Sequence, residues 1–443
     1  MLGEYRITGR GAAEIAASVE RAIGDGSLKP GQPLPAQRAL AAELGVNANT
    51  VAAAYRGLRE RGVIETDGRR GSRVRARPAS APREAMPFEV PPDARDISTG
   101  NPDPALLPPL GPALARAAER ADLAPVRYGA PAVDPELAAL ARARFDADGV
   151  PAGPIAVTSG ALDGIERVLA AWLRPGDAIA VEDPGWGALL DLVAALGLRP
   201  VPCPLDDAGL QPEGLARALR AGARALVLTA RAQNPTGAAI TPARAGELRA
   251  VLAEHPEVLV MEDDHGRGIV SAPLAPVAGA GERWALVHSL AKSHGPDLRL
   301  AVVTGDPATV DRLAGRQRLG PGWVSQLLQW TAADLWRTGA VDQSAVAARY
   351  DARRRAMLTA LAERGVPARG ASGLNVWVQV PDETAAVAQL LRAGWVVAPG
   401  ARFRIGSPPA IRLTVAELTE AEVAPLADLV AHAVRPASGS RLG

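Results

Sequence analysis

The chain has 443 residues, 48% of them apolar, and a net charge of only +1. That length exceeds what one hydrophobic core usually organises, so two or three domains are expected. No apolar run approaches the ~20 residues that a membrane helix needs, the N-terminus lacks a signal-peptide pattern, and the single cysteine excludes an intrachain disulfide. These features predict a cytoplasmic protein with no membrane contact.

The charge is unevenly distributed along the chain. Residues 1–77 contain 13 basic and 8 acidic side chains, a net charge of +5, which leaves −4 for the remainder. A basic segment at one end of a mildly acidic protein favours nucleic-acid contact at that end.

Three helices and a hairpin are expected in this basic segment. Apolar residues at helical spacing predict helices over residues 12–24 and 36–44, and Asn47 can cap a third helix whose buried face holds Val51, Ala54, Tyr55 and Leu58. Residues 62–66 and 72–77 are predicted strands joined by a basic turn. This order is that of a winged helix-turn-helix domain, which we place at residues 1–77.

The segment from Leu34 to Tyr55 resembles the GntR family of winged-helix regulators. The resemblance implies binding to a double-stranded DNA operator, with the start of the third helix in the major groove and the hairpin tip against the duplex. It implies a role in DNA contact for Arg38, Asn47, Asn49, Thr50, Arg69, Arg70 and Gly71. Ala48 and Ala52 stand where the family often has arginine, so base readout falls to the Asn and Thr side chains.

A segment rich in proline, alanine and charge follows at residues 78–96 and is predicted to be a linker. An ordered arm lying on a domain is an alternative for its second half.

After residue 96, short apolar runs alternate with amphipathic stretches. The runs are at residues 155–158, 178–181, 225–229, 258–261, 284–287 and 301–304. This alternation predicts a large α/β domain with a mainly parallel sheet at residues 97–341. Helices mixed with strands at 375–380, 395–398 and 410–414 predict a small α+β domain at residues 342–443.

Lysine occurs only twice, at Lys29 and Lys292, while 47 basic residues are arginine. Arginine stays protonated at accessible pH and cannot serve as a nucleophilic amine, whereas lysine can. Lys292 is therefore a candidate reactive residue.

Motifs that precede Lys292 appear in an order that suits a phosphorylated aromatic cofactor. Thr158 to Ala161 follows a strand and opens a helix, which exposes backbone N–H groups to a phosphate. Trp186 can stack on a ring, Asn234 can bond a ring oxygen, and a carboxylate of the run from Glu262 to His265 can pair with a ring nitrogen.

The set resembles the fold type I aminotransferases over residues 97–430, which implies pyridoxal 5′-phosphate (PLP) as cofactor. It implies Lys292 as the Schiff-base lysine, Asp263 on the pyridine nitrogen, Asn234 on the ring oxygen and Arg412 on a ligand carboxylate. It further implies a cofactor site that includes Ser159, Gly160, Ala161, Trp186, His265, Ser289 and Arg299, with Tyr128 reaching the phosphate of a second subunit in a homodimer.

The fusion of the two halves resembles the MocR group of GntR regulators, in particular its PtsJ-like branch. His265 stands where many members have tyrosine, and Ala188 replaces the arginine of members that respond to GABA, so GABA is not the expected effector. We expect a regulator that senses PLP, or an amine or amino acid that reacts with PLP. A catalytically active aminotransferase with a vestigial DNA-binding domain is the alternative, because Asn234 is the residue of true aminotransferases.

Overall fold

The computed structural model describes residues 6–24, 27–29, 31–60, 63–66, 71–74 and 90–434. Arg69 and Arg70, two of the predicted DNA contacts, lie outside the described residues, as does most of the predicted linker. No helix in the described ranges is long and apolar enough to cross a membrane.

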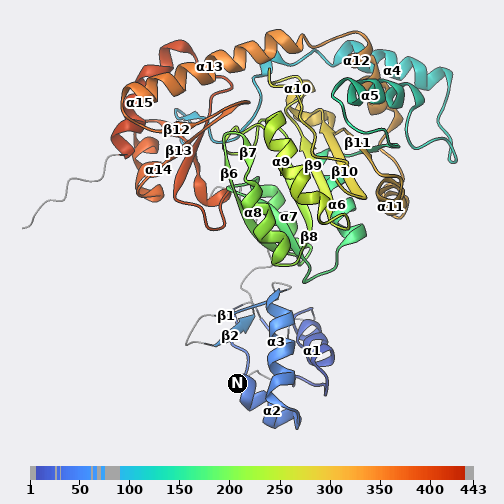
Figure 1. Cartoon of the computed structure of the whole chain (residues 1–443), viewed down its shortest axis with the longest axis vertical. Coiled ribbons are helices and arrows are strands. Elements are labelled where there is room, and N and C mark those ends of the chain that lie inside the picture. The colour runs from blue at the N-terminus through green and yellow to red at the C-terminus, as the bar shows by residue number, and fades with distance from the viewer. Residues whose placement is uncertain are drawn as a thin grey trace, which may run out of the picture. The chain divides into compact units, whose positions relative to one another are not determined.

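The N-terminal elements match the predicted winged helix-turn-helix order (Figure 1). They are α1 (Ala12–Gly24), α2 (Gln37–Leu44), α3 (Ala48–Glu60), β1 (Ile64–Thr66) and β2 (Ser72–Val74). Gly45 ends α2 in a left-handed conformation with φ of 66°, which glycine adopts without steric cost. The strands pair antiparallel, with Ile64 opposite Val74. Both face a small core in which Ile15, Val19 and Leu58 are fully buried.

Most of the chain beyond residue 90 surrounds an eight-stranded sheet. Its strand order is β4-β11-β10-β9-β8-β5-β6-β7. The strands are β4 (Ile155–Thr158), β5 (Ala178–Asp183), β6 (Arg199–Asp206), β7 (Gly209–Leu210), β8 (Ala223–Thr229), β9 (Leu259–Asp264), β10 (Arg283–Ser289) and β11 (Ala301–Gly305). β8, β9 and β10 run parallel, whereas β11 is antiparallel to both its neighbours, so the predicted mainly parallel sheet is confirmed.

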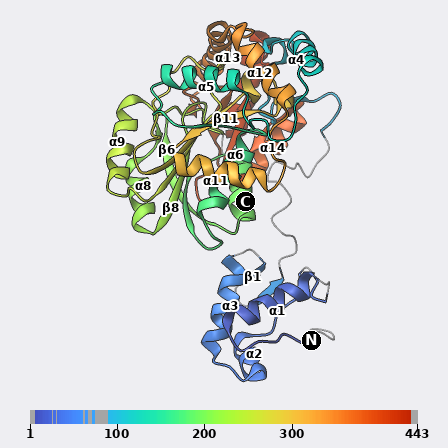
Figure 2. The same ribbon diagram turned by 90° about the vertical axis from the view of Figure 1, so that its right-hand side faces the viewer.

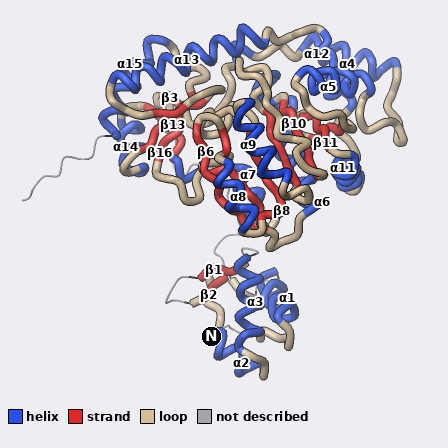
Figure 3. Tube along the Cα trace, in the orientation of Figure 1, coloured by secondary structure: helices blue, strands red, loops and turns tan. Residues whose placement is uncertain are grey.

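Helices flank this sheet, as Figure 3 shows by colour. They are α4 (Gly111–Leu123), α5 (Pro135–Ala147), α6 (Ala161–Trp172), α7 (Gly187–Ala195), α8 (Pro212–Arg220), α9 (Pro242–Ala253), α10 (Ala291–His294), α11 (Pro307–Arg318) and α12 (Gln326–Arg337). Three of them begin at a capping residue followed by proline: Asp134, Thr241 and Asp306 each accept a backbone N–H of the first turn. The cap satisfies an otherwise unpaired donor, and proline needs none at that position.

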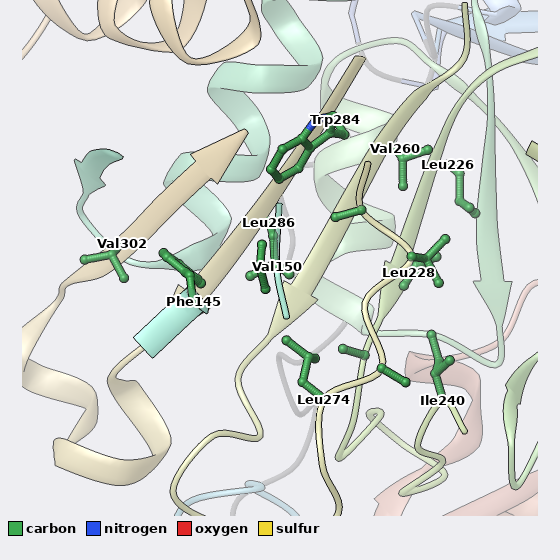
Figure 4. Packing of buried hydrophobic residues seen from close by; sticks show 14 of the residues in the cluster. Phe145, Val150, Leu226, Leu228, Ile240, Val260, Leu274, Trp284, Leu286 and Val302 are labelled. Carbon is green, nitrogen blue, oxygen red and sulfur yellow. The ribbon is translucent and has the colours of Figure 1, made fainter. Parts of the chain in front are cut away.

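Apolar side chains of the strands and flanking helices form the main core (Figure 4). Leu226, Val260 and Leu286 come from three adjacent strands and are fully buried, and Phe145 of α5 packs in the same cluster. α4 and α12 lie side by side (Figure 1 and Figure 2).

The C-terminal part forms a four-stranded antiparallel sheet with order β12-β13-β16-β15. Its elements are α13 (Gln343–Glu363), β12 (Ala368–Arg369), β13 (Asn375–Gln379), α14 (Glu383–Arg392), β14 (Trp395–Val396), β15 (Ala398–Pro399), β16 (Ala410–Thr414) and α15 (Glu420–Val434). α13 and α15 pack together beside this sheet (Figure 1).

The end of the predicted linker is ordered. Arg95 and Asp96 form β3, which pairs parallel with β14, and the Arg95 guanidinium contacts Glu422 at 3.1 Å. Ile97, placed by sequence at the start of the large domain, is instead buried in the core of the small sheet. The ordered-arm alternative thus describes these residues, because backbone pairing with β14 satisfies their polar groups.

The hydroxyl of Tyr55 on α3 donates to the carbonyl of Pro35, at 2.9 Å, and its ring is fully buried. Tyr55→Phe should destabilise the packing of α3 on the start of α2 by about 1 kcal/mol, because the partly buried Pro35 carbonyl loses its donor. Hydrogen exchange of α3 amides, read by mass spectrometry, should then be roughly fivefold faster. Tyr128→Phe is the matched control, since Tyr128 is 94% exposed. Unchanged α3 exchange in Tyr55→Phe would contradict the prediction.

Candidate cofactor site and nucleic-acid interface

The ends of parallel strands bring the predicted cofactor residues to one edge of the large sheet. Asp263 of β9 lies in register between Thr229 of β8 and Val287 of β10. Asn234, His265 and Ser289 therefore follow or end neighbouring strands on the same side. Open parallel sheets bind ligands at this carboxyl edge.

Lys292 lies on the short helix α10, one turn after β10. Its Nζ donates to the carbonyl oxygen of Gly100 at 2.7 Å. Gly100 has φ of +69°, and a Cβ there would lie 3.3 Å from the Arg412 guanidinium. The amine and the guanidinium thus approach one another across the segment from Ser98 to Gly100, which no motif in the sequence singled out.

Arg412 on β16 brings the small sheet to this site. Its Nη1 donates to Asn234 Oδ1 at 2.8 Å, its Nη2 donates to the carbonyl of Ser98, and its guanidinium carbon lies 4.7 Å from the centre of the Phe403 ring. The side chain is 3% exposed. The two residues expected at a ring oxygen and at a ligand carboxylate therefore bind each other directly in this structure.

Asp263 is 3% exposed and has two differently placed oxygens. Oδ2 lies 2.7 Å from Nδ1 of His265, whereas Oδ1 is buried and has no hydrogen-bond partner among the residues that the structure describes. A buried unpaired carboxylate oxygen is costly, so an external donor is expected there.

The loop after β4 and Arg299 form a close cradle. Arg299 Nη2 donates to the carbonyl of Ser159 at 3.0 Å, and a Cβ added at Gly160 would lie 2.6 Å from Arg299 Nη2. Ala161 begins α6, so the loop ends at a helix N-terminus, where backbone N–H groups favour an anion. Ser289 is buried, and its Oγ accepts the N–H of Ala291 at 3.3 Å.

Two predicted cofactor residues stand apart from these contacts. Trp186 follows β5 and is partly buried. Tyr128 lies in the loop after α4, is 94% exposed and meets Trp323 edge to face at 5.7 Å.

These residues fit PLP on three observations. The unpaired Oδ1 of Asp263 offers an acceptor for a pyridine N–H, the cradle of Gly160 and Arg299 suits a phosphate, and Lys292 supplies a primary amine.

Asp264, the neighbour of Asp263, forms a buried ion pair with Arg231 that the sequence did not reveal. Arg231 contacts both oxygens of Asp264 at 2.9 Å, and its Nη1 donates to the carbonyl of Ala272. Burial alone would raise the pKa of Asp264, but the attraction of Arg231 outweighs it and holds that pKa well below its ordinary value. The sequence gives no spacing signal for this pair, because 33 residues separate its members.

The predicted DNA-contact residues that the structure describes lie on the N-terminal elements. Arg38 on α2 and Asn49 on α3 are exposed, Thr50 is partly buried, and Gly71 precedes β2 with φ of +80°. Asn47 Oδ1 accepts the N–H of Asn49 at 2.8 Å, which confirms Asn47 as the cap of α3. Its oxygen is thereby engaged within the chain.

The fold and the two sites define a class of protein, a helix-turn-helix DNA-binding domain joined to an aminotransferase-like domain. The chain matches the bacterial gntR family of regulatory proteins over residues 12–74 and the aminotransferase class I and II family over residues 96–430.

Curated relatives include transcription regulators. The chain is 39% identical to the vitamin B6 salvage pathway transcriptional repressor PtsJ of Salmonella typhimurium over 95% of this chain and 98% of the relative. It is 29% identical to the transcriptional regulator TauR of Rhodobacter capsulatus over 87% and 88% of the two chains. It is 31% identical to the pyridoxine biosynthesis regulator PdxR of Corynebacterium glutamicum over 60% and 59%.

Solved aminotransferases share the fold of the larger part. Aspartate aminotransferase of Rhizobium meliloti aligns with a TM-score of 0.68 at 24% identity, covering 77% of this chain and 91% of that chain. The kynurenine aminotransferase of Pyrococcus horikoshii aligns with a TM-score of 0.68 at 21% identity, covering 78% and 92%.

The chain belongs to the aminotransferase class I and II family and, with its gntR-family domain, is a MocR-type regulator similar to PtsJ. It is a transcription regulator whose cofactor is PLP. The predicted fold class is confirmed.

Arg231→Met should lower the free energy of unfolding by about 3–5 kcal/mol, because the buried Asp264 carboxylate would lose its arginine partner and keep only the contact with His288 at 3.5 Å. Adding Asp264→Leu to that variant should recover much of the loss. Arg364→Met is the matched control, since its partner Asp428 is largely exposed, and the loss of stability should be much smaller because solvent screens this pair. Urea unfolding measures all three, and equal losses in Arg231→Met and Arg364→Met would contradict the assigned weight of the buried pair.

Proposed function

We propose that this chain is a cytoplasmic homodimeric regulator that binds PLP at Lys292 and binds operator DNA with α3 and the wing, with PLP as the effector. One observation supports the proposed PLP site. Three groups lie at the same edge of the large sheet: the Lys292 amine, the unpaired Oδ1 of Asp263 and the Arg412 guanidinium. The similarity to PtsJ and PdxR supports PLP, and vitamin B6 genes as targets.

Each residue has a distinct task at the site. Bound PLP supplies an aldehyde that reacts with amines and a ring that withdraws electrons. Lys292 donates the amine, Asp263 accepts from the pyridine nitrogen, and Gly160, Ser289 and Arg299 hold the phosphate. Asn234 can donate its amide N–H to the ring oxygen, because its Oδ1 already accepts from Arg412.

PLP changes operator affinity only by the difference in its binding free energy between two arrangements of the protein, typically about 1–3 kcal/mol. The small sheet is suited to sense occupancy, because Arg412 and the residues from Ser98 to Gly100 connect it to Lys292.

Catalytic turnover is a second candidate function. It is favoured by the joint presence of Lys292, Asn234 and a buried Arg412, which can receive a ligand carboxylate with a bidentate guanidinium. Steady conversion of an amino donor with a keto-acid acceptor would establish it, and a lack of turnover in PLP-loaded protein would exclude it for the donors tried.

Lys292→Ala should abolish the yellow absorbance of the purified protein, because Lys292 is the only lysine outside the DNA-binding domain. Lys29→Arg is the matched control and should keep the colour. Borohydride reduction followed by peptide mapping should place PLP on Lys292. PLP found on Lys29 instead would overturn the assignment.

DNA contacts should divide into two kinds. Asn49→Ala or Thr50→Ala should cost about 1–3 kcal/mol on DNA from upstream of the gene and little on a scrambled duplex, since the start of α3 reads base edges. Arg38→Ala should weaken binding to both duplexes and reduce the salt slope by about one unit, because it neutralises a phosphate. Titrations at several salt concentrations separate the two, and equal losses on both duplexes for Asn49→Ala would argue against sequence readout by α3.

Sedimentation should show a dimer. The side chains of Leu123, Tyr128 and Leu319 are 87%, 94% and 91% exposed in the single chain, and contact with a second subunit would cover them. Tyr128→Ala should weaken PLP binding, because the hydroxyl is expected to reach the phosphate of the second subunit. A monomer that binds one PLP per chain would defeat this prediction.

A further inference from the structure

His265 lies two residues after Asp263 and bridges it to a backbone carbonyl. Its Nδ1 is 2.7 Å from Asp263 Oδ2, and its Nε2 is 2.9 Å from the carbonyl oxygen of Ala232. Both ring nitrogens are thus engaged, and the imidazole has one orientation that satisfies both.

The chemistry of these acceptors fixes where the protons lie. A carbonyl oxygen only accepts, so Nε2 carries a hydrogen. Nδ1 and a carboxylate oxygen at 2.7 Å would repel each other through their lone pairs unless a proton lies between them. A proton therefore lies between Nδ1 and Oδ2, and with Asp263 ionised the contact is a charge-assisted hydrogen bond donated by the imidazolium of His265.

The Ala232 carbonyl is held in place by the surrounding fold. Ala232 has φ of 56°, in the left-handed region that alanine rarely adopts, and its N–H donates to Ser372 Oγ at 2.9 Å. A Cβ added at Gly373 would lie 2.6 Å from the Ala232 Cβ, so that glycine permits the close approach. Preceding it, Arg231 is fixed by its two contacts with Asp264. The acceptor for Nε2 is thus positioned by packing from two directions.

Charged groups around His265 act in opposite directions. Burial lowers the pKa of the imidazole and Lys292 lowers it further, but Asp263 outweighs both and raises the pKa above its ordinary value. The Asp264 carboxylate lies against Arg231 and His288 instead.

We propose that His265 is a positioning residue for Asp263: it occupies Oδ2 and leaves Oδ1 as the one oxygen directed to the pyridine nitrogen of PLP. The inference rests on the proposed PLP site.

Three variants test the proposal in the full-length dimeric protein. His265→Phe removes both contacts and should weaken PLP binding by at least about tenfold, with a changed absorbance spectrum, because the carboxylate loses a charged donor. His265→Asn places an amide N–H where Nδ1 lies, and should restore affinity to within about threefold of wild type and restore the spectrum. His255→Asn is the matched control, since His255 is a partly exposed histidine whose one ion-pair contact, to Glu257, is 4.0 Å long.

A second measurement keeps the contact separate from PLP binding. In PLP-free protein, the strongly hydrogen-bonded Nδ1 proton should give a downfield proton NMR signal that survives in His255→Asn and is lost in His265→Phe and in Asp263→Ala. Loss of this signal in both variants identifies the bond between His265 and Asp263 without any use of PLP. Attachment of PLP to a lysine other than Lys292 would contradict the proposed PLP site and not the bond. Wild-type PLP affinity in His265→Phe, an equally weak His265→Asn, or a signal that persists in Asp263→Ala would each overturn the positioning role.

Discussion

Because β8, β9 and β10 run parallel and in register, the residues that end or follow them reach one edge of the sheet. This register fixes the position of Asp263. It also fixes where the chain leaves each strand, and so positions Asn234, His265 and Lys292. Each of these strands contains a run of three or four apolar residues, and nearly all of its residues are buried, which leaves little freedom for the register to slip. The chemistry of the site thus depends on the packing of residues that take no part in it.

A second constraint connects the small sheet to this edge. Two side chains donate hydrogen bonds to the segment from Ser98 to Gly100: Arg412 donates to the carbonyl of Ser98, and Lys292 donates to the carbonyl of Gly100. In the proposed site, reaction of the Lys292 amine with PLP would remove the contact of Lys292 and leave the contact of Arg412 in place. Occupancy would then change how β16 and the segment after β3 are held. This is a physical route by which PLP can alter the small sheet, and it begins where the chain from the DNA-binding domain enters the fold.

Much of this organisation could be predicted from the sequence, since local patterns carry it. The winged-helix order follows from helical spacing, from the Asn47 cap and from the basic turn, and the strand runs follow from short apolar stretches. Lys292 was identifiable because arginine replaces lysine nearly everywhere else.

What could not be predicted depends on contacts between distant residues. Arg231 with Asp264, and Lys292 with Gly100, join positions 33 and 192 residues apart. The bond from His265 to Asp263 is local, but it is made only because the left-handed Ala232 presents its carbonyl to the other ring nitrogen. Strands as short as β3 and β14 carry too few residues for a period and form by pairing with each other.

Binding of PLP at Lys292 and binding of operator DNA at α3 should be thermodynamically coupled. The most direct test titrates DNA from upstream of the gene into the protein with and without PLP, and titrates PLP with and without that DNA. Thermodynamic linkage requires that PLP change the affinity for DNA by the same factor by which DNA changes the affinity for PLP, expected at about 5- to 150-fold. In Lys292→Ala, PLP should leave the affinity for DNA unchanged. Identical DNA affinity with and without PLP in the wild type, or an undiminished PLP effect in Lys292→Ala, would contradict the account.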